Sequence, residues 1–179
     1  MDSPLMPLFA HPAEIFERGE GPYLYTDKGE RYLDFIGGIA VSAFGYGRPE
    51  IVSALKAQDD KVWHVSNLFK VPGQVELATR FSNATFADVA FFTNSGTEAV
   101  ECALKLARKY HHANGNPDRI DILTFEGAFH GRSYAAVNAT GNDSYLEGFG
   151  PRLPGYVTKI PYGDLDAVKA KVGPTTAAI

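Results

Sequence analysis

The stretch that decides the fold is residues 89–112, VAFFTNSGTEAVECALKLARKYHH. It opens with the apolar run 89–92, which predicts a buried strand, and continues through small polar residues. From Glu98 to His112, apolar residues recur at helical spacing, and this predicts an amphipathic helix. Strand, turn and helix in this order are typical of one unit of a parallel α/β sheet.

The segment after this helix continues the alternation of strand and helix. The expected strands lie at 120–125, 156–160 and 176–179, and the expected helices at 133–139 and 165–172. Such alternation predicts an α/β domain with a mostly parallel sheet flanked by helices. Because a doubly wound sheet requires further strands, we expect the chain to be truncated, as the first part of a longer domain.

The N-terminal region predicts an α+β segment that precedes this domain. Residues 23–35 alternate around the turn 26–29, TDKG, and predict a β-hairpin. Helical spacing then predicts one helix over about 49–62 and another over about 73–81.

The composition is that of a globular protein with a sizeable core. The chain has 179 residues, of which 45% are hydrophobic and 12% aromatic. Lys and Arg total 17 against 21 Asp and Glu, so the net charge is −4, and no stretch concentrates basic residues. We therefore do not expect a nucleic-acid partner.

The cysteine content and the N-terminus bear on the compartment. Cys102 is the one cysteine of the sequence, and no Cys or His spacing is that of a zinc site. We therefore expect no disulfide, no metal and a reducing compartment, of which the cytoplasm fits best. Residues 1–4 do not begin a leader, and no run reaches the roughly 18 apolar residues of a membrane span, so we expect neither export nor membrane insertion.

Residues 93–98, TNSGTE, form the turn between the expected buried strand and the helix. In a parallel sheet such a turn opens at the carboxyl edge of the strands, where ligands bind. Unpaired N–H groups at the helix start, the hydroxyls of Ser95 and Thr97, and the close approach that Gly96 permits favour an anion such as phosphate. The alternative is that Ser95 or Thr97 only caps the helix, because hydroxyl caps are common.

Residues 127–132, GAFHGR, follow the next apolar strand, and we expect them at the same edge of the sheet. Phe129 can lie flat against an aromatic ring, and Arg132 carries a planar guanidinium suited to a carboxylate. The alternatives are a phenylalanine that fills the core and an arginine that is solvated at the surface. If the ligand interpretation holds, two adjacent loops face one ligand.

Taken together, these residues resemble the class III pyridoxal-phosphate-dependent aminotransferases. The likeness rests on residues 94–99 (NSGTEA), a helix with Glu101 and Lys105, and residues 129–132 (FHGR). It extends over most of the chain. The further similar stretches are 19–21, 32–35 (YLDF), 38–41 (GIAV), 63–69 (WHVSNLF) and 145–151 (YLEGFGP), and they are similar to the acetylornithine branch of the family.

The resemblance implies the fold of the type I pyridoxal-phosphate enzymes. It implies that residues 1–62 begin the small domain and that residues 63–179 form the first half of the large, cofactor-binding domain. The implied enzyme is a homodimer that moves an amino group from N-acetylornithine to 2-oxoglutarate, yielding glutamate, in arginine biosynthesis.

The resemblance also assigns roles to individual residues. Ser95, Gly96 and Thr97 are expected to hold the phosphate of pyridoxal 5'-phosphate, Phe129 to stack on its pyridine ring, and Arg132 to receive the substrate carboxylate. The family's cofactor-bonding lysine and its aspartate for the pyridine nitrogen lie beyond residue 179. We therefore expect no catalytic residue within this chain, and the segment alone should be inactive.

Two stretches depart from the family pattern, and Lys105 needs separate mention. Residues 45–49, GYGRP, differ from the family, which more often has histidines there, and the difference is expected to alter a loop. Ser133 and Tyr134 replace the more usual threonine and leucine, so a difference is expected in the fine shape of the substrate side and not on the cofactor side. Lys105 does not replace the missing lysine, because it lies four residues after Glu101 and is expected to form a surface ion pair with it.

Two other functions remain open. The first is a sibling of the same class that uses succinylornithine, succinyldiaminopimelate, ornithine or 4-aminobutyrate. The second is a non-catalytic phosphate-binding or structural module of the same fold. An unpaired terminal strand would leave an exposed apolar edge in such a module, and this favours part of a longer enzyme.

Overall fold

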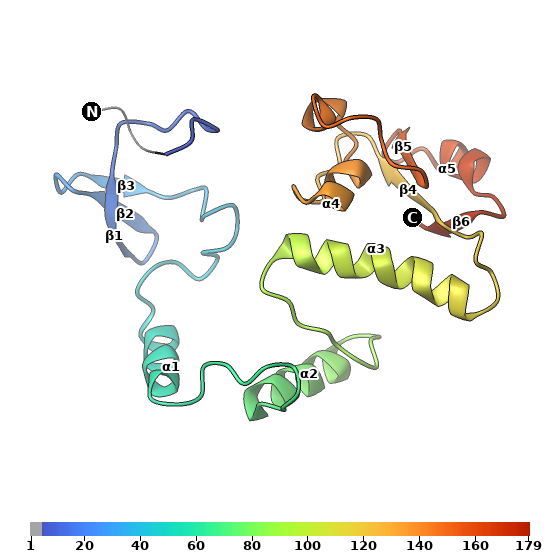
Figure 1. The fold of residues 1–179 in the computed structure, drawn as a ribbon. Coiled ribbons are helices and arrows are strands. Elements are labelled where there is room, and N and C mark those ends of the chain that lie inside the picture. The colour runs from blue at the N-terminus through green and yellow to red at the C-terminus, as the bar shows by residue number, and fades with distance from the viewer. Residues whose placement is uncertain (1–4) are drawn as a thin grey trace. The chain divides into compact units, whose positions relative to one another are not determined.

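The computed structural model describes residues 5–179, which divide into two compact units at Glu76 and Leu77 (Figure 1). The first four residues of the expected 1–62 segment lie outside the described range. Within that range, no helix combines the length and the apolar content that a membrane crossing requires.

The first unit contains a three-stranded antiparallel sheet of β1 (Phe16–Glu20), β2 (Tyr23–Thr26) and β3 (Arg31–Leu33). The predicted hairpin is confirmed as β2 and β3. Thr26 closes its turn, because Thr26 Oγ1 accepts the N–H groups of Lys28 and Glu30 at 3.3 and 3.1 Å. Strand β1 was not predicted, because its residues FERGE lack apolar alternation and reach β2 through backbone pairing.

Two helices follow, α1 (Pro49–Asp59) and α2 (Pro72–Ala84). Both predictions are confirmed, although α1 ends earlier and α2 ends later than the spacing indicated. At the end of α1, Trp63 Nε1 donates to the Asp59 carbonyl oxygen at 2.7 Å. This bond satisfies one of the carbonyl groups that a helix end leaves without an intrahelical partner.

Tyr46, within the stretch that differs from the family, is bound to the sheet of the first unit. Its backbone N–H and C=O exchange hydrogen bonds of 2.8 and 2.9 Å with Gly21, and its hydroxyl donates to Asp34 Oδ2 at 2.6 Å. A Cβ on Gly19 would lie 2.3 Å from the Tyr46 ring, so only glycine fits beneath the ring. The tyrosine therefore does more than shape a loop.

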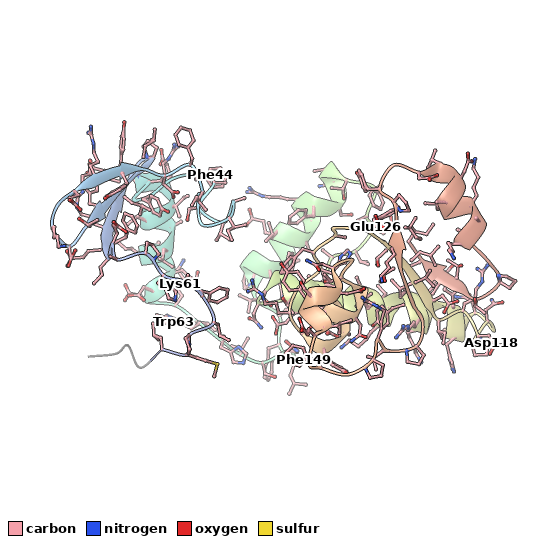
Figure 2. The ribbon with its side chains drawn as sticks, turned by 90° about the horizontal axis from the view of Figure 1, so that it is seen from above. Phe44, Lys61, Trp63, Asp118, Glu126 and Phe149 are labelled. Carbon is pink, nitrogen blue, oxygen red and sulfur yellow. The ribbon has the colours of Figure 1, made fainter. Side chains whose placement is uncertain are left out.

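The buried apolar side chains of the described residues all lie in the second unit. In the first unit, by contrast, Phe35 is 91%, Val41 87%, Phe44 73% and Trp63 79% exposed, and the last two are labelled in Figure 2. Many strongly exposed apolar side chains are typical of regions that other chain segments or other subunits cover.

The second unit contains a three-stranded parallel sheet in the order β5-β4-β6 (Figure 1). Its elements in chain order are α3 (Gly96–Ala113), β4 (Asp121–Phe125), α4 (Tyr134–Ala139), the 3-10 helix η1 (Asp143–Leu146), β5 (Tyr156–Ile160), α5 (Leu165–Lys171) and β6 (Thr176–Ala178). The parallel sheet and the strands and helices predicted from residue 98 onward are confirmed. Helix η1 lies in a stretch that carries no local helical signal.

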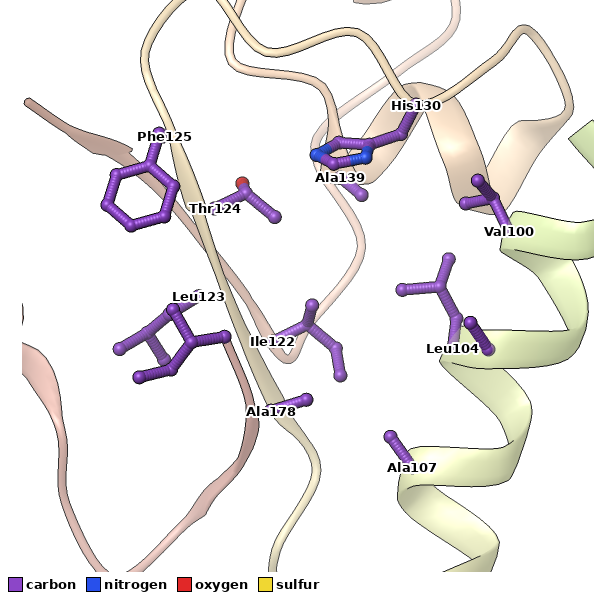
Figure 3. Close-up of a pocket in the computed structure, with 12 residues that line it drawn as sticks. Val100, Leu104, Ala107, Ile122, Leu123, Thr124, Phe125, His130, Ala139 and Ala178 are labelled. Atoms are coloured by element: carbon purple, nitrogen blue, oxygen red, sulfur yellow. The ribbon is translucent and has the colours of Figure 1, made fainter. Parts of the chain in front are cut away.

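The core of this unit lies between α3, α4 and one face of the sheet. It consists of Leu104, Ile122, Ala139 and Tyr156, which are all buried. In Figure 3, Ile122 of β4 points toward Leu104 of α3, while Leu123 points away from that helix. The alternation of side chains along β4 thus directs one set of apolar residues to α3. The resulting packing of α3 on the sheet brings the start of this helix beside the loop that follows β4.

One predicted strand is absent. Residues 89–92 form no strand, and Val89 and Phe91 are 86% and 74% exposed. A strand needs a neighbour for its backbone N–H and C=O groups, and no strand in the described range pairs with this run. The prediction is therefore wrong here, because an apolar run specifies a strand only where the tertiary structure supplies a partner.

Candidate functional site

Ser95 and Glu98 close the N-terminus of α3 with a capping arrangement. The Ser95 backbone is extended, with φ −152° and ψ 160°, and Ser95 Oγ accepts the Glu98 N–H at 3.2 Å. The Glu98 carboxylate accepts the Asn94 N–H at 2.8 Å and the Ser95 hydroxyl at 3.3 Å. This is a variant of the capping box, so the capping role of Ser95 is confirmed.

The cap leaves two backbone donors at this helix start. Gly96 and Thr97 lie in the first turn of α3, where N–H groups have no acceptor within the helix. Gly96 is exposed, and a Cβ there would meet no atom within 4 Å, so the approach to these donors is open. Together with the partial positive charge of the helix end, the donors favour an anion such as phosphate.

The loop after β4 packs against the same helix start. Gly131 in this loop is buried and has a φ of +124°. A Cβ built on Gly131 would lie 2.8 Å from Thr97 Oγ1 and 3.2 Å from Ala136 Cβ. The backbone of one predicted loop therefore lies directly on a side chain of the other, and the structure brings the two motifs together.

Glu101 and Ser133 join the same two segments one helical turn further along α3. Ser133 Oγ donates a hydrogen bond to Glu101 Oε1. Residues four apart share a helix face, so Thr97 and Glu101 both face the second loop. The predicted ion pair of Glu101 with Lys105 is wrong: the ion pairs of the described residues do not include it, and the carboxylate accepts from Ser133 instead.

Phe129 is an accessible ring with two neighbours. It is 57% exposed, so the alternative of a core-filling phenylalanine is wrong. The Tyr145 ring stands edge-on to it, with 6.1 Å between the centroids and 75° between the planes. The guanidinium carbon of the exposed Arg132 lies 5.6 Å from the Phe129 centroid. No role was predicted for Tyr145, because no local pattern connects it with Phe129.

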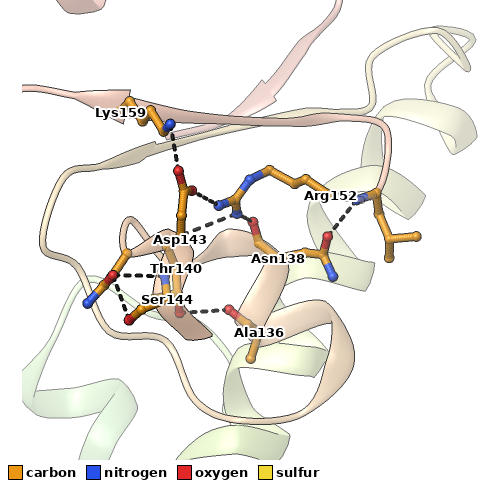
Figure 4. A network of polar contacts seen from close by, with 9 residues as sticks. Ala136, Asn138, Thr140, Asp143, Ser144, Arg152 and Lys159 are labelled. Atoms are coloured by element: carbon orange, nitrogen blue, oxygen red, sulfur yellow. Dashed lines mark hydrogen bonds and ion pairs between the residues drawn. The ribbon is translucent and has the colours of Figure 1, made fainter. Parts of the chain in front are cut away.

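A polar network connects α4 with the segment on either side of Tyr145 (Figure 4). At its centre is Asn138, whose side chain is fully buried. Asn138 Nδ2 donates to the Tyr134 carbonyl oxygen at 2.7 Å, and Asn138 Oδ1 accepts the Leu153 N–H at 2.5 Å. Both polar ends of this buried amide are therefore satisfied.

Arg152 extends the network from α4 to the start of η1. Its guanidinium donates to the carbonyl oxygens of Asn138 and Thr140 and, at 2.8 Å, to Asp143 Oδ1. Lys159 Nζ lies 2.6 Å from the other Asp143 carboxylate oxygen. The hydrogen bonds from Lys159 and then from Arg152 hold the pKa of Asp143 below its ordinary value.

A cavity of about 370 Å³ lies between α3 and the sheet (Figure 3). Its lining is apolar except for Thr124 and His130, and Thr124 Oγ1 is buried without a hydrogen-bond partner. Such a lining suits apolar groups rather than phosphate. Residues 5–179 include no group of three or more histidine, cysteine or carboxylate side chains that could hold a metal ion.

Comparisons with known proteins agree with these motifs. The family model described as Aminotransferase class-III matches residues 9–178. The chain is 55% identical over 177 residues to an acetylornithine aminotransferase of Agrobacterium fabrum, covering 99% of the chain and 44% of that protein. It is 58% identical over 176 residues to acetylornithine aminotransferase 2 of Caulobacter vibrioides, covering 98% of the chain and 43% of that protein. The chain thus spans less than half the length of these relatives.

Solved structures show the same likeness. An ornithine aminotransferase from Toxoplasma gondii matches with a TM-score of 0.90 and 25% identity, covering 98% of this chain and 42% of that one. An (S)-enantioselective omega-transaminase from Thermomicrobium roseum matches with a TM-score of 0.87 and 30% identity, covering 98% of this chain and 46% of that one. The expected type I fold is confirmed, and enzymes of this class use pyridoxal phosphate. The chain belongs to the class III aminotransferases.

Proposed function

We propose that the chain supplies the phosphate, ring and substrate-carboxylate contacts of an aminotransferase that moves an amino group from N-acetylornithine to 2-oxoglutarate, forming glutamate, in arginine biosynthesis. Support comes from the names of the curated relatives, at 55% and 58% identity. Because the chain covers 44% and 43% of those proteins, the activity belongs to the complete protein that contains this segment.

The residues of the α3 start fit the phosphate of pyridoxal 5'-phosphate. The N–H groups of Gly96 and Thr97 are the donors, and Ser95 orders the turn through its cap and adds a hydroxyl at the same place. The observation that carries the proposal is the contact of Gly131 with Thr97, because it brings the loop that bears Phe129 to the anion-binding helix start.

Phe129 and Arg132 form the ring and substrate contacts. When bound, the cofactor supplies an electron-withdrawing ring for transamination. Phe129 presents an accessible aromatic face against which such a ring stacks, and it excludes water from that side. Arg132 presents a planar, permanently charged fork that suits the carboxylate of N-acetylornithine.

The complete protein is proposed to be a cytoplasmic homodimer. The exposed apolar side chains of the first unit, such as Phe35 and Val41, offer surface for a subunit interface. Residues 1–62 are proposed to belong to the small domain and residues 63–179 to the first half of the large domain. Sedimentation of the complete protein measures the dimer directly.

The test is the absorbance spectrum of the complete protein with pyridoxal phosphate, recorded before and after borohydride reduction. We expect a cofactor band that borohydride changes and that N-acetylornithine bleaches, whereas residues 1–179 alone should show neither response. Glutamate formation is then compared for N-acetylornithine, succinylornithine, succinyldiaminopimelate, ornithine and 4-aminobutyrate.

Each outcome has a defined meaning. Bleaching by another amine in place of N-acetylornithine would assign the chain to a sibling enzyme of the same class. Absence of any cofactor band in the complete protein would contradict the aminotransferase proposal and favour a non-catalytic module.

A further inference from the structure

We propose that Tyr145 is a positioning residue for the cofactor ring, acting through Phe129, and that the Asn138–Arg152–Asp143 network holds Tyr145 in place. The inference rests on the proposed function, since it concerns the ring on which Phe129 stacks. Both Tyr145 and the network lie outside the two loops that form the proposed site.

The contact between Tyr145 and Phe129 restricts the phenylalanine ring. Phe129 is 57% exposed and lies in a loop between β4 and α4, so neither regular backbone structure nor a surrounding core fixes its plane. The Tyr145 ring is inclined at 75° to the Phe129 ring, with 6.1 Å between the centroids, and this geometry is a favourable one for aromatic pairs. Because the planes are inclined, Tyr145 does not lie flat on Phe129, as the ring of a parallel pair would.

Tyr145 owes its own position to η1. At the start of this 3-10 helix, Asn142 Oδ1 accepts the N–H and the hydroxyl of Ser144 at 3.0 and 2.9 Å. The neighbouring Asp143 is anchored by Arg152 Nη2 at 2.8 Å. Because η1 has four residues, the anchor at Asp143 determines where Tyr145, two positions later, can lie.

The anchor is rigid because Arg152 is itself held on the core. Its side chain is 18% exposed, and it donates to the carbonyl oxygens of Asn138 and Thr140 at the end of α4. Asn138 is fully buried and binds the Leu153 N–H, which fixes the backbone beside Arg152 (Figure 4). Lys159 contacts the same carboxylate from the solvent side, since its side chain is 61% exposed. Arg152 and Lys159 thus bind the same carboxylate, one held on the core and the other exposed, and an exposed ion pair contributes little stability. They form a matched pair for a test.

The experiment uses the complete protein and measures two quantities that do not depend on turnover. The first is the equilibrium affinity of the cofactor-free protein for pyridoxamine 5'-phosphate. The second is the circular dichroism of the bound cofactor band, normalised to bound cofactor, which reports how the ring is held. Tyr145→Leu is expected to weaken binding about three- to tenfold, the size of one aromatic pair, and to reduce the dichroism. Tyr145→Phe keeps the ring and should restore both to within about twofold of the original.

The network is tested with Arg152→Met and Lys159→Met. Arg152→Met should reproduce the effect of Tyr145→Leu on the dichroism, whereas Lys159→Met should leave it unchanged. Asp143→Asn removes the charge from the same anchor and so weakens it, without removing Arg152 from its carbonyl partners, and it replaces Arg152→Met if that variant does not fold.

The outcomes separate the inference from the proposed function. If the original protein binds no cofactor, the proposed function fails. If it binds and Tyr145→Leu leaves affinity and dichroism unchanged, Tyr145 has no positioning role. If Lys159→Met acts like Arg152→Met or Asp143→Asn, the support by the buried network is wrong.

Discussion

Gly131 and Thr97 are packed so closely that a Cβ on Gly131 would lie 2.8 Å from Thr97 Oγ1. Thr97 belongs to the first turn of α3, and Gly131 to the loop after β4. The pair thus joins the helix start that is proposed to hold the phosphate to the loop that carries Phe129 and Arg132, and the geometry of the proposed site depends on it.

Gly131→Ala is expected to destabilise the protein by about 1–3 kcal/mol, because the new methyl group meets Thr97 and Ala136 and the residue has a φ of +124°. It should also weaken cofactor binding, because the loop must move away from the helix start. Denaturant unfolding of the complete protein measures the first effect and cofactor titration the second. Gly127→Ala is the control, since its φ is +72° but its Cβ would meet nothing within 4 Å. Equal cofactor affinities of the two variants would contradict the importance of the Gly131 contact.

Ser95→Ala is expected to cost about 1 kcal/mol of stability, because Ser95 Oγ accepts the Glu98 N–H at the N-cap. Ser95→Asn keeps a capping acceptor and should recover most of this stability. Thermal unfolding of the cofactor-free protein measures the loss of stability that comes from the cap, without any contribution from bound cofactor. If the serine hydroxyl also binds the phosphate, both variants should weaken binding of pyridoxal phosphate, and the loss in Ser95→Asn would then be independent of helix stability.

Glu101 and Ser133 are expected to be coupled by about 1–2 kcal/mol in a double-mutant cycle of Glu101→Ala and Ser133→Ala, because their hydrogen bond involves a carboxylate. Since Ser133 follows Arg132, each single change should raise KM for N-acetylornithine more than it weakens cofactor binding. Lys105→Ala is the control and should change stability by less than about 0.5 kcal/mol. A coupling of Glu101 with Lys105 that equals its coupling with Ser133 would contradict the contact.

Tyr46→Phe is expected to raise the pKa of Asp34 toward its ordinary value. The hydroxyl of Tyr46, followed by the Gly37 N–H, lowers the pKa of Asp34 from 3.8 by binding its ionised form. A lowered pKa means that this carboxylate adds stability above pH 3.8, which is lost as the pH falls through the lower folded-state value. Titration of Asp34 by NMR should show the shift, and acid unfolding should begin at a higher pH in the variant. Tyr32→Phe, whose ring packs on Phe16, is the control and should leave the Asp34 titration unchanged.

The start of α3 shows why much of the site could be predicted. Capping residues and helical periodicity act over three or four positions, so Ser95, Glu98 and the following helix form one local signal. The same holds for the hairpin around Thr26 and for α5, at whose start Asp164 accepts the N–H groups of Asp166 and Ala167. For these local signals the prediction and the structure agree.

Residues 89–92 and Glu101 are positions where a prediction from local sequence was wrong. The apolar run 89–92 predicted a strand, but a strand forms only with a hydrogen-bonding neighbour, and none among the described residues pairs with it. Glu101 has Lys105 at ion-pair spacing, yet its carboxylate accepts from Ser133, 32 positions away. Spacing along a helix says which residues share a face, not what the tertiary structure brings to that face.

By itself, the sequence determined the order of the α-helices and strands from α3 onward, the parallel character of the sheet, and the two motifs that carry the family likeness. Only the tertiary structure decided that Gly131 lies on Thr97, that Ser133 binds Glu101, and that Tyr145 stands against Phe129. The reason is physical: periodicity and capping are short-range properties of the chain, whereas these contacts depend on how the intervening segments pack onto one core.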